Sequence, residues 1–295
     1  MSDPLPPSRI DARVLGVRAD DGHHFELITR VPDGAHAHLL WLPALGVAAR
    51  HYVPFAEALA ARGVAVYLHE WRGNGSSSVR ASRHNDWGYR ELLQHDIPAS
   101  EAAIRAATGA GPDTYGGHSL GGQLATCRLA LRVQAGEDPA TVARALWLVA
   151  SGAPYWRAFP RPTRYWLPMA YRFLPWLAHR RGALPGRAIG FGGDEARGVI
   201  TDWARTAITG RYAAPGIDAD IEAGMAKLTL PVRAVLPKDD WLAPRSSIDF
   251  LLSKFGPGER DVRVLDSETL RAPADHFSWM RQPSGIAALL TNVVL

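Results

Sequence analysis

Apolar residues gather along the chain into short runs of the length of buried β-strands, each bounded by turn-forming residues. Such runs lie at residues 38–42, 64–69, 113–117, 145–150, 232–237 and 262–266. Before the first of them, two alternating stretches, RIDARVLGVRA and HFELITRVP, flank the turn signal Asp20-Asp21-Gly22. This pattern predicts an antiparallel hairpin followed by a series of buried strands.

Stretches with helical spacing of apolar residues separate or follow these runs. They lie at residues 50–62, 86–108, 120–133, 246–255 and 282–291. Asp86 is the expected N-cap of the second stretch, and Gly63 and Gly109 are expected to end the first two. The alternation of strands and helices predicts an α/β fold, with a mostly parallel central sheet that helices cover on both faces.

One long segment interrupts the alternation. Residues 152–230 connect the run at 145–150 to the run at 232–237, and this is too long for a bare loop. We therefore expect a core made of residues 1–151 and 231–295 and an inserted unit of residues 152–230. The first part of the insert, residues 155–181, holds eight aromatic residues and six arginines but no acidic residue.

The strongest chemical signal is Gly117-His118-Ser119-Leu120-Gly121, which lies between a predicted strand and a predicted helix. A sharp turn there lifts the serine hydroxyl above the sheet edge, and the small neighbours let strand and helix approach closely. The N–H group of Leu120 then faces the place where an oxyanion forms. Alone, this motif also fits a simple strand–helix turn, so a catalytic role for Ser119 requires a base and an acid elsewhere in the chain.

A serine hydroxyl is a weak nucleophile and needs a base that is oriented by an acid. Asp239 and Asp240 follow the strand at 232–237, where the carboxyl end of a sheet strand faces the active-site crevice. His276 follows the last predicted strand. The order serine, acid, histidine is the one that accompanies this turn in known enzymes.

Outside the insert, these residues resemble the α/β-hydrolase family. In that family a proline stands four residues after the acid, as Pro244 does after Asp240, so Asp240 is preferred to Asp239. His276-Phe277-Ser278-Trp279 is similar to the family's histidine motif. The resemblance implies an α/β-hydrolase fold in which Ser119, Asp240 and His276 form the catalytic triad, with the insert as a helical cap over the serine.

The resemblance also extends to two loops. Residues 43–47, Pro-Ala-Leu-Gly-Val, resemble the first loop of predicted bacterial α/β hydrolases, and by position the Leu45 N–H is the second oxyanion donor beside that of Leu120. Residues 70–77 resemble a glycine-rich family loop in which Glu70 here replaces Asp. We expect Arg72 to hold that loop in place and Glu70 to be structural.

In the family, the cap shapes the pocket. We therefore expect substrate contacts from the aromatic insert and from residues beside the triad, namely His118, Tyr155, Trp156, Trp166 and Trp241. The alternative is that the aromatic residues only pack the cap onto the core and that His118 is a packing residue. The arginines of the insert are expected to meet an anionic substrate group or, by peripheral contact, an anionic membrane surface, or else to form a solvated face.

Composition excludes several classes of protein. The 295 residues are 47% hydrophobic, which is ample for a core, and the net charge of +4 is too small to indicate a nucleic-acid partner. The chain has no transmembrane run and no signal-peptide pattern, and Cys127 is its single cysteine, so we expect a cytoplasmic protein. Carboxylates are sparse near the paired histidines and no nucleotide motif is present, so we expect no metal and no cofactor.

The sequence thus predicts a serine hydrolase that cleaves a small-molecule carboxylic ester or thioester through an acyl-enzyme. A dehalogenase or epoxide hydrolase of this fold needs a carboxylate nucleophile where Ser119 stands. Two alternatives stay open: an acyltransferase that uses the same triad, and a non-catalytic ligand-binding module on the same fold. The sequence does not indicate the oligomeric state.

Overall fold

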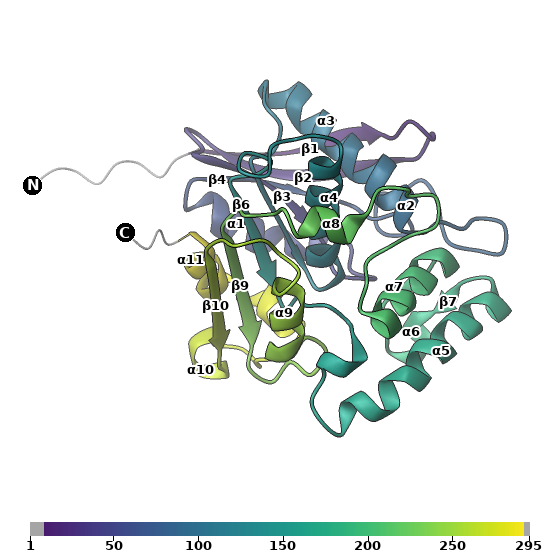
Figure 1. The fold of residues 1–295 in the computed structure, drawn as a ribbon. Coiled ribbons are helices and arrows are strands. Elements are labelled where there is room, and N and C mark those ends of the chain that lie inside the picture. Colours follow the sequence, from purple (N-terminus) through teal and green to yellow (C-terminus); the bar gives the residue numbers. More distant parts are fainter. Residues whose placement is uncertain (1–8, 292–295) are drawn as a thin grey trace, which may run out of the picture.

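The computed structural model describes residues 9–291 as a twisted sheet with helices on both faces and a helical lobe beside it (Figure 1). Residues 1–8 and 292–295, which include the N-terminal segment considered above and the two ends of the expected core, lie outside the described residues. Across residues 9–291, none of the helices combines the length and the apolar content needed to cross a bilayer.

Eight strands form the central sheet in the order β1-β2-β4-β3-β5-β6-β9-β10. Their bounds are β1 Ile10–Arg18, β2 His24–Pro32, β3 Ala37–Leu42, β4 Val64–Leu68, β5 Thr114–His118, β6 Ala145–Val149, β9 Val232–Pro237 and β10 Arg260–Leu265. β2 runs antiparallel to both β1 and β4, and all other neighbours run parallel. The predicted hairpin and the mostly parallel sheet are confirmed.

Helices cover both faces of this sheet. Their bounds are η1 Ala49–Tyr52, α1 Val53–Ala60, α2 Tyr89–Glu91, η2 Leu92–Asp96, α3 Ile97–Thr108, α4 Leu120–Gln134, α9 Arg245–Leu252, α10 Ser267–Leu270, η4 Ser278–Arg281 and α11 Ser284–Thr291. In β3, Leu40 and Leu42 pack into the cluster that includes α3 and α4, whereas Leu39 and Trp41 pack on the side of α1 and α11. This two-residue period is that of a strand buried on both faces.

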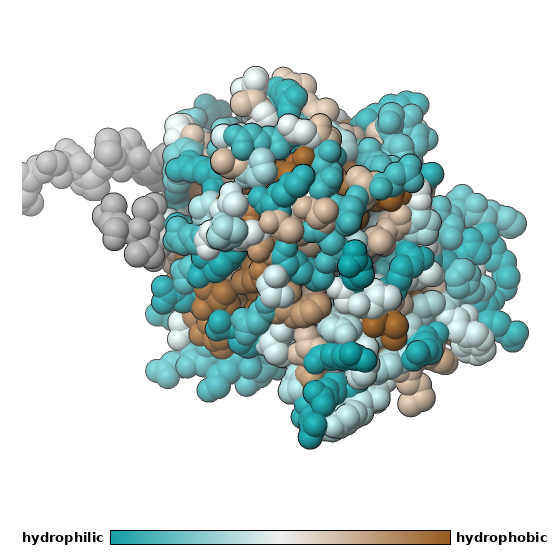
Figure 2. Space-filling model, viewed as in Figure 1, coloured by the Kyte–Doolittle hydropathy of each residue, from teal (hydrophilic) through white to brown (hydrophobic). Residues whose placement is uncertain are grey.

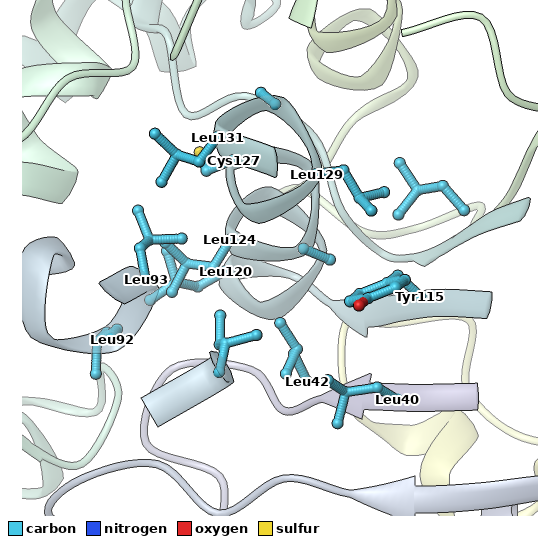
Figure 3. Close-up of a cluster of buried hydrophobic side chains, with 14 of the residues drawn as sticks. Leu40, Leu42, Leu92, Leu93, Tyr115, Leu120, Leu124, Cys127, Leu129 and Leu131 are labelled. Atoms are coloured by element: carbon cyan, nitrogen blue, oxygen red, sulfur yellow. The ribbon is translucent and has the colours of Figure 1, made fainter. Parts of the chain in front are cut away.

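The larger of the two core clusters surrounds α4, the helix that follows the predicted nucleophile. Figure 3 shows Leu120 and Leu124 of this helix close to Leu93, with Leu40 and Leu42 of β3 beneath. All five side chains are buried. The first turn of α4 is thus anchored in the core, and this fixes the position of the residue that precedes it.

The helix predicted from Asp86 begins three residues later, and Asp86 is not its N-cap. Helical residues run from Tyr89 to Thr108 through α2, η2 and α3, with a π-helical turn at η2. The Tyr89 N–H donates to Asp202 of the insert at 2.9 Å, whereas the Asp86 carboxylate accepts from the Gly198 N–H at 3.1 Å. The Gly88 N–H also donates to Glu91 at 2.7 Å, so this local bond and the contact with Asp202 of the insert take the place of the cap predicted at Asp86.

The insert forms several helices outside the central sheet. Its elements are η3 Trp156–Ala158, α5 Thr163–Arg181, β7 Leu184–Pro185, α6 Gly186–Ile189, β8 Asp194–Glu195, α7 Arg197–Thr209 and α8 Ile221–Met225. α5, α6 and α7 gather in a lobe beside the sheet (Figure 1). α8 instead packs on α4, where a Cβ at Gly224 would lie 2.3 Å from the Ala130 carbonyl oxygen. The exact boundaries of the cap at residues 152 and 230 stay a prediction.

Candidate functional site

Ser119 stands at the tight turn between β5 and α4. Its backbone has φ 54° and ψ −119°, a conformation that a residue with a side chain adopts rarely and at a cost. Such strain is typical of functional positions that the surrounding structure holds in place. The turn places Ser119 on the wall of a cavity between the core and the insert.

Two glycines of the motif are needed because the backbones touch. A Cβ at Gly117 would lie 2.3 Å from the carbonyl carbon of Gly121, and a Cβ at Gly121 would lie 2.0 Å from the carbonyl oxygen of Leu42. Either substitution would push α4 away from the sheet. The hydroxyl of Ser151 also donates to the Ser119 carbonyl at 2.7 Å, and this holds the turn from β6.

His276 lines the same cavity as Ser119 and forms an acid–base pair with Asp240. His276 Nδ1 lies 2.7 Å from Asp240 Oδ2, and both residues are buried. Asp240 Oδ1 accepts from the N–H groups of Leu242 at 2.9 Å and Ala243 at 3.1 Å, so the carboxylate cannot rotate away. Asp239 is exposed and its N–H donates to the Ala274 carbonyl, so the structure pairs Asp240, not Asp239, with His276.

The loop that carries His276 is held from both sides of the histidine. The carboxylate of Asp275 accepts from the Phe277 and Ser278 N–H groups and from the Ser278 hydroxyl. The fully buried Trp279 donates from Nε1 to the His276 carbonyl at 3.1 Å. With Nδ1 engaged by Asp240, the nitrogen left to serve a reacting hydroxyl is His276 Nε2.

The predicted oxyanion donors lie on two converging segments. Leu45 and Leu120 both line the cavity that holds Ser119. In the Leu45 loop, the Ala44 N–H donates to the Tyr52 hydroxyl at 2.9 Å and the Val47 N–H donates to the Ala44 carbonyl. These bonds fix the loop on both sides of the Leu45 and Gly46 amides, and of these two residues Leu45 lines the cavity.

Tyr52 links the oxyanion loop to the serine turn, and nothing in the sequence pointed to it. Its hydroxyl accepts from the Ala44 N–H and lies within hydrogen-bond distance, 2.8 Å, of His118 Nδ1. Burial raises the pKa of the fully buried Tyr52, and burial together with nearby His276 lowers the pKa of His118 well below its usual range. The bridge is therefore a neutral tyrosine bonded to a neutral imidazole.

The cavity over Ser119 has a volume of about 380 Å³ and mostly apolar walls. Ser119, His276, Leu45 and Leu120 line it from the core side. The insert contributes a wall of larger side chains, Phe159, Trp166, Leu167, Tyr171, Phe173, Leu174, Ile189, Phe191 and Trp203. Of these, only Trp166 was singled out from the sequence; the others carried no signal beyond the general aromatic bias of the insert.

The predicted substrate contacts divide into two groups. Trp166 and Trp241 line the cavity, with ring centroids 6.0 Å apart across the junction of insert and core. His118 is fully buried against His276, Tyr155 packs on Phe250, and neither of them nor Trp156 is among the lining residues. The turn that exposes Ser119 directs its neighbour His118 inward, whereas Tyr155 and Trp156 pack against other side chains outside the cavity lining.

The glycine-rich loop at residues 70–77 is structural, as its sequence suggested. The Arg72 guanidinium donates two hydrogen bonds to the buried Asp96, both at 2.7 Å. Glu70 accepts from the Ala49 N–H at 3.1 Å, close to the oxyanion loop. Within residues 9–291, no three His, Cys, Asp or Glu side chains lie close enough together to hold a metal ion.

Comparison with known proteins agrees with this geometry. The family described as serine aminopeptidase, S33 matches residues 34–266. A search of curated protein sequences gave no match. Among solved structures, the esterase domain of a Rhodothermus marinus protein superposes with a TM-score of 0.61 at 14% identity, over 95% of this chain and 96% of that one.

Two other solved structures show the breadth of the likeness. A monoacylglycerol lipase of Paleococcus ferrophilus gives a TM-score of 0.56 at 14% identity, over 96% of this chain and 98% of that one. Epoxide hydrolases from metagenomes of hot environments give 0.62 at 16% identity, over 95% and 97%. At such identities the structures share a fold, and a fold alone does not define a reaction. The family match includes Ser119 and Asp240 and spans most of the chain, which therefore belongs to the serine aminopeptidase S33 family of α/β hydrolases and is a hydrolase.

Proposed function

We propose that this protein is a serine hydrolase that cleaves a carboxylic ester or thioester with an uncharged, apolar acyl group. The observation that carries the proposal is one constellation: Ser119 on a strained turn and His276, held by Asp240, on the wall of the same cavity. A serine, a histidine and an orienting carboxylate in these roles supply nucleophile, base and positioning group.

In the first half of the proposed reaction, Ser119 Oγ attacks the carbonyl carbon of the ester while His276 Nε2 takes the hydroxyl proton. Asp240 holds the imidazole by Nδ1 and stabilises the imidazolium that forms. The N–H groups of Leu120 and Leu45 donate hydrogen bonds to the carbonyl oxygen, on which negative charge develops. The tetrahedral intermediate then collapses, and His276 gives its proton to the departing alcohol or thiol.

In the second half, water replaces the leaving group. His276 Nε2 takes a proton from the water as its oxygen attacks the acyl carbon of the Ser119 ester. The second tetrahedral intermediate collapses, the proton returns to Ser119 Oγ, and the carboxylic acid departs. Each donor of the oxyanion site contributes roughly 3–4 kcal/mol to lowering such barriers.

The cavity wall supports an apolar acyl group. None of the described lining residues is Asp, Glu, Lys or Arg, and the polar side chains are few, such as Ser119, Gln123, Tyr171 and His276. A site for the free amino terminus of a peptide would place a carboxylate near the bound ammonium group, because a buried cation without a partner is costly. The same cost disfavours an anionic substrate group, since the insert's arginines lie elsewhere.

The proposal is tested with a panel of neutral p-nitrophenyl esters and acyl thioesters of increasing chain length, beside amino-acyl anilides. Wild type is expected to hydrolyse the esters or thioesters and not the anilides, and Ser119→Ala is expected to lose the activity. Product analysis separates free acid from an acyl group passed to an added alcohol. Faster cleavage of the amino-acyl anilides, or ester hydrolysis that survives in Ser119→Ala, would overturn the proposal.

A further inference from the structure

Most of the exposed large apolar side chains of this molecule lie in one region. Of ten exposed among the described residues, five lie on α5: Tyr165, Trp166, Met169, Phe173 and Trp176. Three more, Ile189, Trp241 and Phe277, line the cavity. An apolar area of this kind on a soluble domain marks a surface that contacts something else.

The exposed residues share one face of α5. Tyr165, Met169 and Trp176 follow helical spacing of four and seven residues, and Trp166 and Phe173 lie seven residues apart beside them. The exposed fractions reach 71% at Met169 and 55% at Trp176. The opposite face of the helix is also apolar, but there Leu167, Tyr171 and Ala178 are buried against the rest of the insert.

Arginines border this exposed face. Arg172 and Arg180 lie on the same side of α5, three and four residues after Met169 and Trp176, and both are exposed. Arg180 lies over the Trp176 ring at 5.9 Å, and Arg164 lies over the Tyr165 ring at 5.3 Å. Residues 155–181 contain no acidic residue, and in the part of the chain described none of their arginines forms a salt bridge.

The exposed apolar face continues into the cavity. Trp166 and Phe173 are about half exposed and also line the cavity wall, and Trp241 and Phe277 do the same from the core side. They therefore form the rim of the opening that leads to Ser119. In the view of Figure 2, hydrophilic side chains interrupt the hydrophobic areas over much of the molecule.

We propose that the exposed face of α5 and the cavity rim dock on an anionic lipid bilayer, so that the cavity opens toward the membrane surface. Tryptophan and tyrosine favour the headgroup level of a bilayer, where their rings are half wet. Arginines bordering an apolar helix face are attracted to anionic lipid and hold the helix in the plane of the interface. Charge complementarity thus selects an anionic surface over a neutral one.

The experiment measures binding of the purified protein to vesicles by flotation. One set of vesicles contains phosphatidylcholine only and the other also contains phosphatidylglycerol. Wild type and Ser119→Ala are expected to bind the anionic vesicles equally, because the docking does not depend on catalysis, and high salt is expected to weaken the binding. Loss of ester hydrolysis in Ser119→Ala with retained vesicle binding separates the two proposals.

Two sets of variants with matched controls identify the surface. Arg164→Gln, Arg172→Gln and Arg180→Gln together are expected to lower partition onto anionic vesicles on the order of 100-fold, since each basic residue near such a surface contributes about 1 kcal/mol. The control replaces Arg18, Arg105 and Arg263, three exposed arginines on β1, α3 and β10, by Gln. This control is expected to bind as wild type does.

The apolar set removes side chains that lie outside the cavity wall. Met169→Ala with Trp176→Ala is expected to lower partition onto vesicles about tenfold or more while hydrolysis of a soluble short-chain ester stays unchanged. Val14→Ala with Val264→Ala, at exposed apolar positions on β1 and β10, is the control. Absence of vesicle binding, equal effects of the α5 sets and their controls, or a self-association in solution that Met169→Ala with Trp176→Ala abolishes would overturn the proposal.

Discussion

The core and the insert of this hydrolase line two sides of one cavity and differ in how their side chains are held. On the core side, the acid and the base of the triad are buried and held by hydrogen bonds. Asp240 accepts from two backbone N–H groups and pairs with His276 Nδ1, and the His276 carbonyl accepts from Trp279. On the insert side, α5 turns large apolar side chains outward, and its arginines form no salt bridge with the described residues. The contrast separates a region built for fixed geometry from a region built for contact.

This difference indicates which changes affect which step. Substitutions on the core side disturb atoms whose positions decide the barrier, so they are expected to lower kcat. Substitutions on the outer insert are expected to change binding or delivery and to leave the chemistry alone. An outer-insert substitution that lowered kcat, or a core substitution that changed only binding, would contradict this comparison.

The largest expected effect follows from Asp240→Asn. This variant keeps the shape of the side chain but favours the wrong tautomer of His276, and kcat is expected to fall roughly 10⁴-fold. The matched control is Asp239→Asn, which changes the exposed neighbour and is expected to keep nearly full activity. Steady-state kinetics on one ester compares them. Equal losses in both variants would contradict the assignment of Asp240.

The second effect concerns the junction between insert and core. Burial raises the pKa of Glu195 to about 7 from 4.5, despite a hydrogen bond from the Gly193 N–H. The native state therefore holds this proton more tightly than the unfolded state does, and stability falls as pH rises from about 4.5 to about 7. Glu195→Gln has no such titrating group. As pH rises from about 4.5 to about 7, the free energy of unfolding of Glu195→Gln is therefore expected to increase relative to that of wild type by up to about 3 kcal/mol.

Urea denaturation at the two ends of that pH range measures the Glu195 effect. Glu259→Gln, at an exposed position, is the control and is expected to show no such growth. Neighbouring Asp194 and Arg187 act on Glu195 in opposite directions and are kept unchanged. A constant difference between Glu195→Gln and wild type at both pH values would contradict the buried, protonated carboxyl.

Tyr52→Phe tests whether the two halves of the core site are held together. The variant leaves the Ala44 N–H and His118 Nδ1 without their buried partner, which costs about 1–3 kcal/mol in stability. Because the oxyanion loop loses its link to the serine turn, kcat is expected to fall roughly 10- to 100-fold while KM changes little. Tyr67→Phe, which removes another hydroxyl bonded to a histidine, His38, is the control. Unchanged kcat in Tyr52→Phe would show that the bridge does not position the site.

The smallest expected effect lies on the cavity wall of the insert. Phe173→Ala shortens a side chain that lines the cavity and is expected to raise KM for long acyl chains about tenfold, with short-chain esters little affected. Trp156→Ala, on the same insert but away from the lining, is the control. A fall in kcat for short-chain esters in Phe173→Ala would contradict the assignment of the insert wall to binding and of the core to catalysis.

Much of the fold was predictable because its signals are local. The apolar runs marked the strands, and the turn Asp20-Asp21-Gly22 marked the hairpin. The motif around Ser119 was also readable, since close backbone contacts at Gly117 and Gly121 permit no side chain.

What the sequence did not reveal depends on contacts between distant segments. Asp86 fits a helix cap locally, but the structure uses Asp202 from the insert instead. Tyr52 joins residues 44 and 118, and no pattern in the sequence predicts such a bridge. Tyr155 and Trp156 were expected at the substrate from the aromatic composition of the insert, and His118 from its place beside Ser119. Composition and spacing show which side chains are present but not which way they face.

The central claim is that Ser119 is a nucleophile activated by His276, and intact-mass analysis after treatment with a fluorophosphonate tests it most directly. The account predicts one adduct on the wild type, no adduct on Ser119→Ala, and much slower labelling of His276→Ala. Folded wild type that takes no adduct, or an adduct that persists on Ser119→Ala, would contradict it.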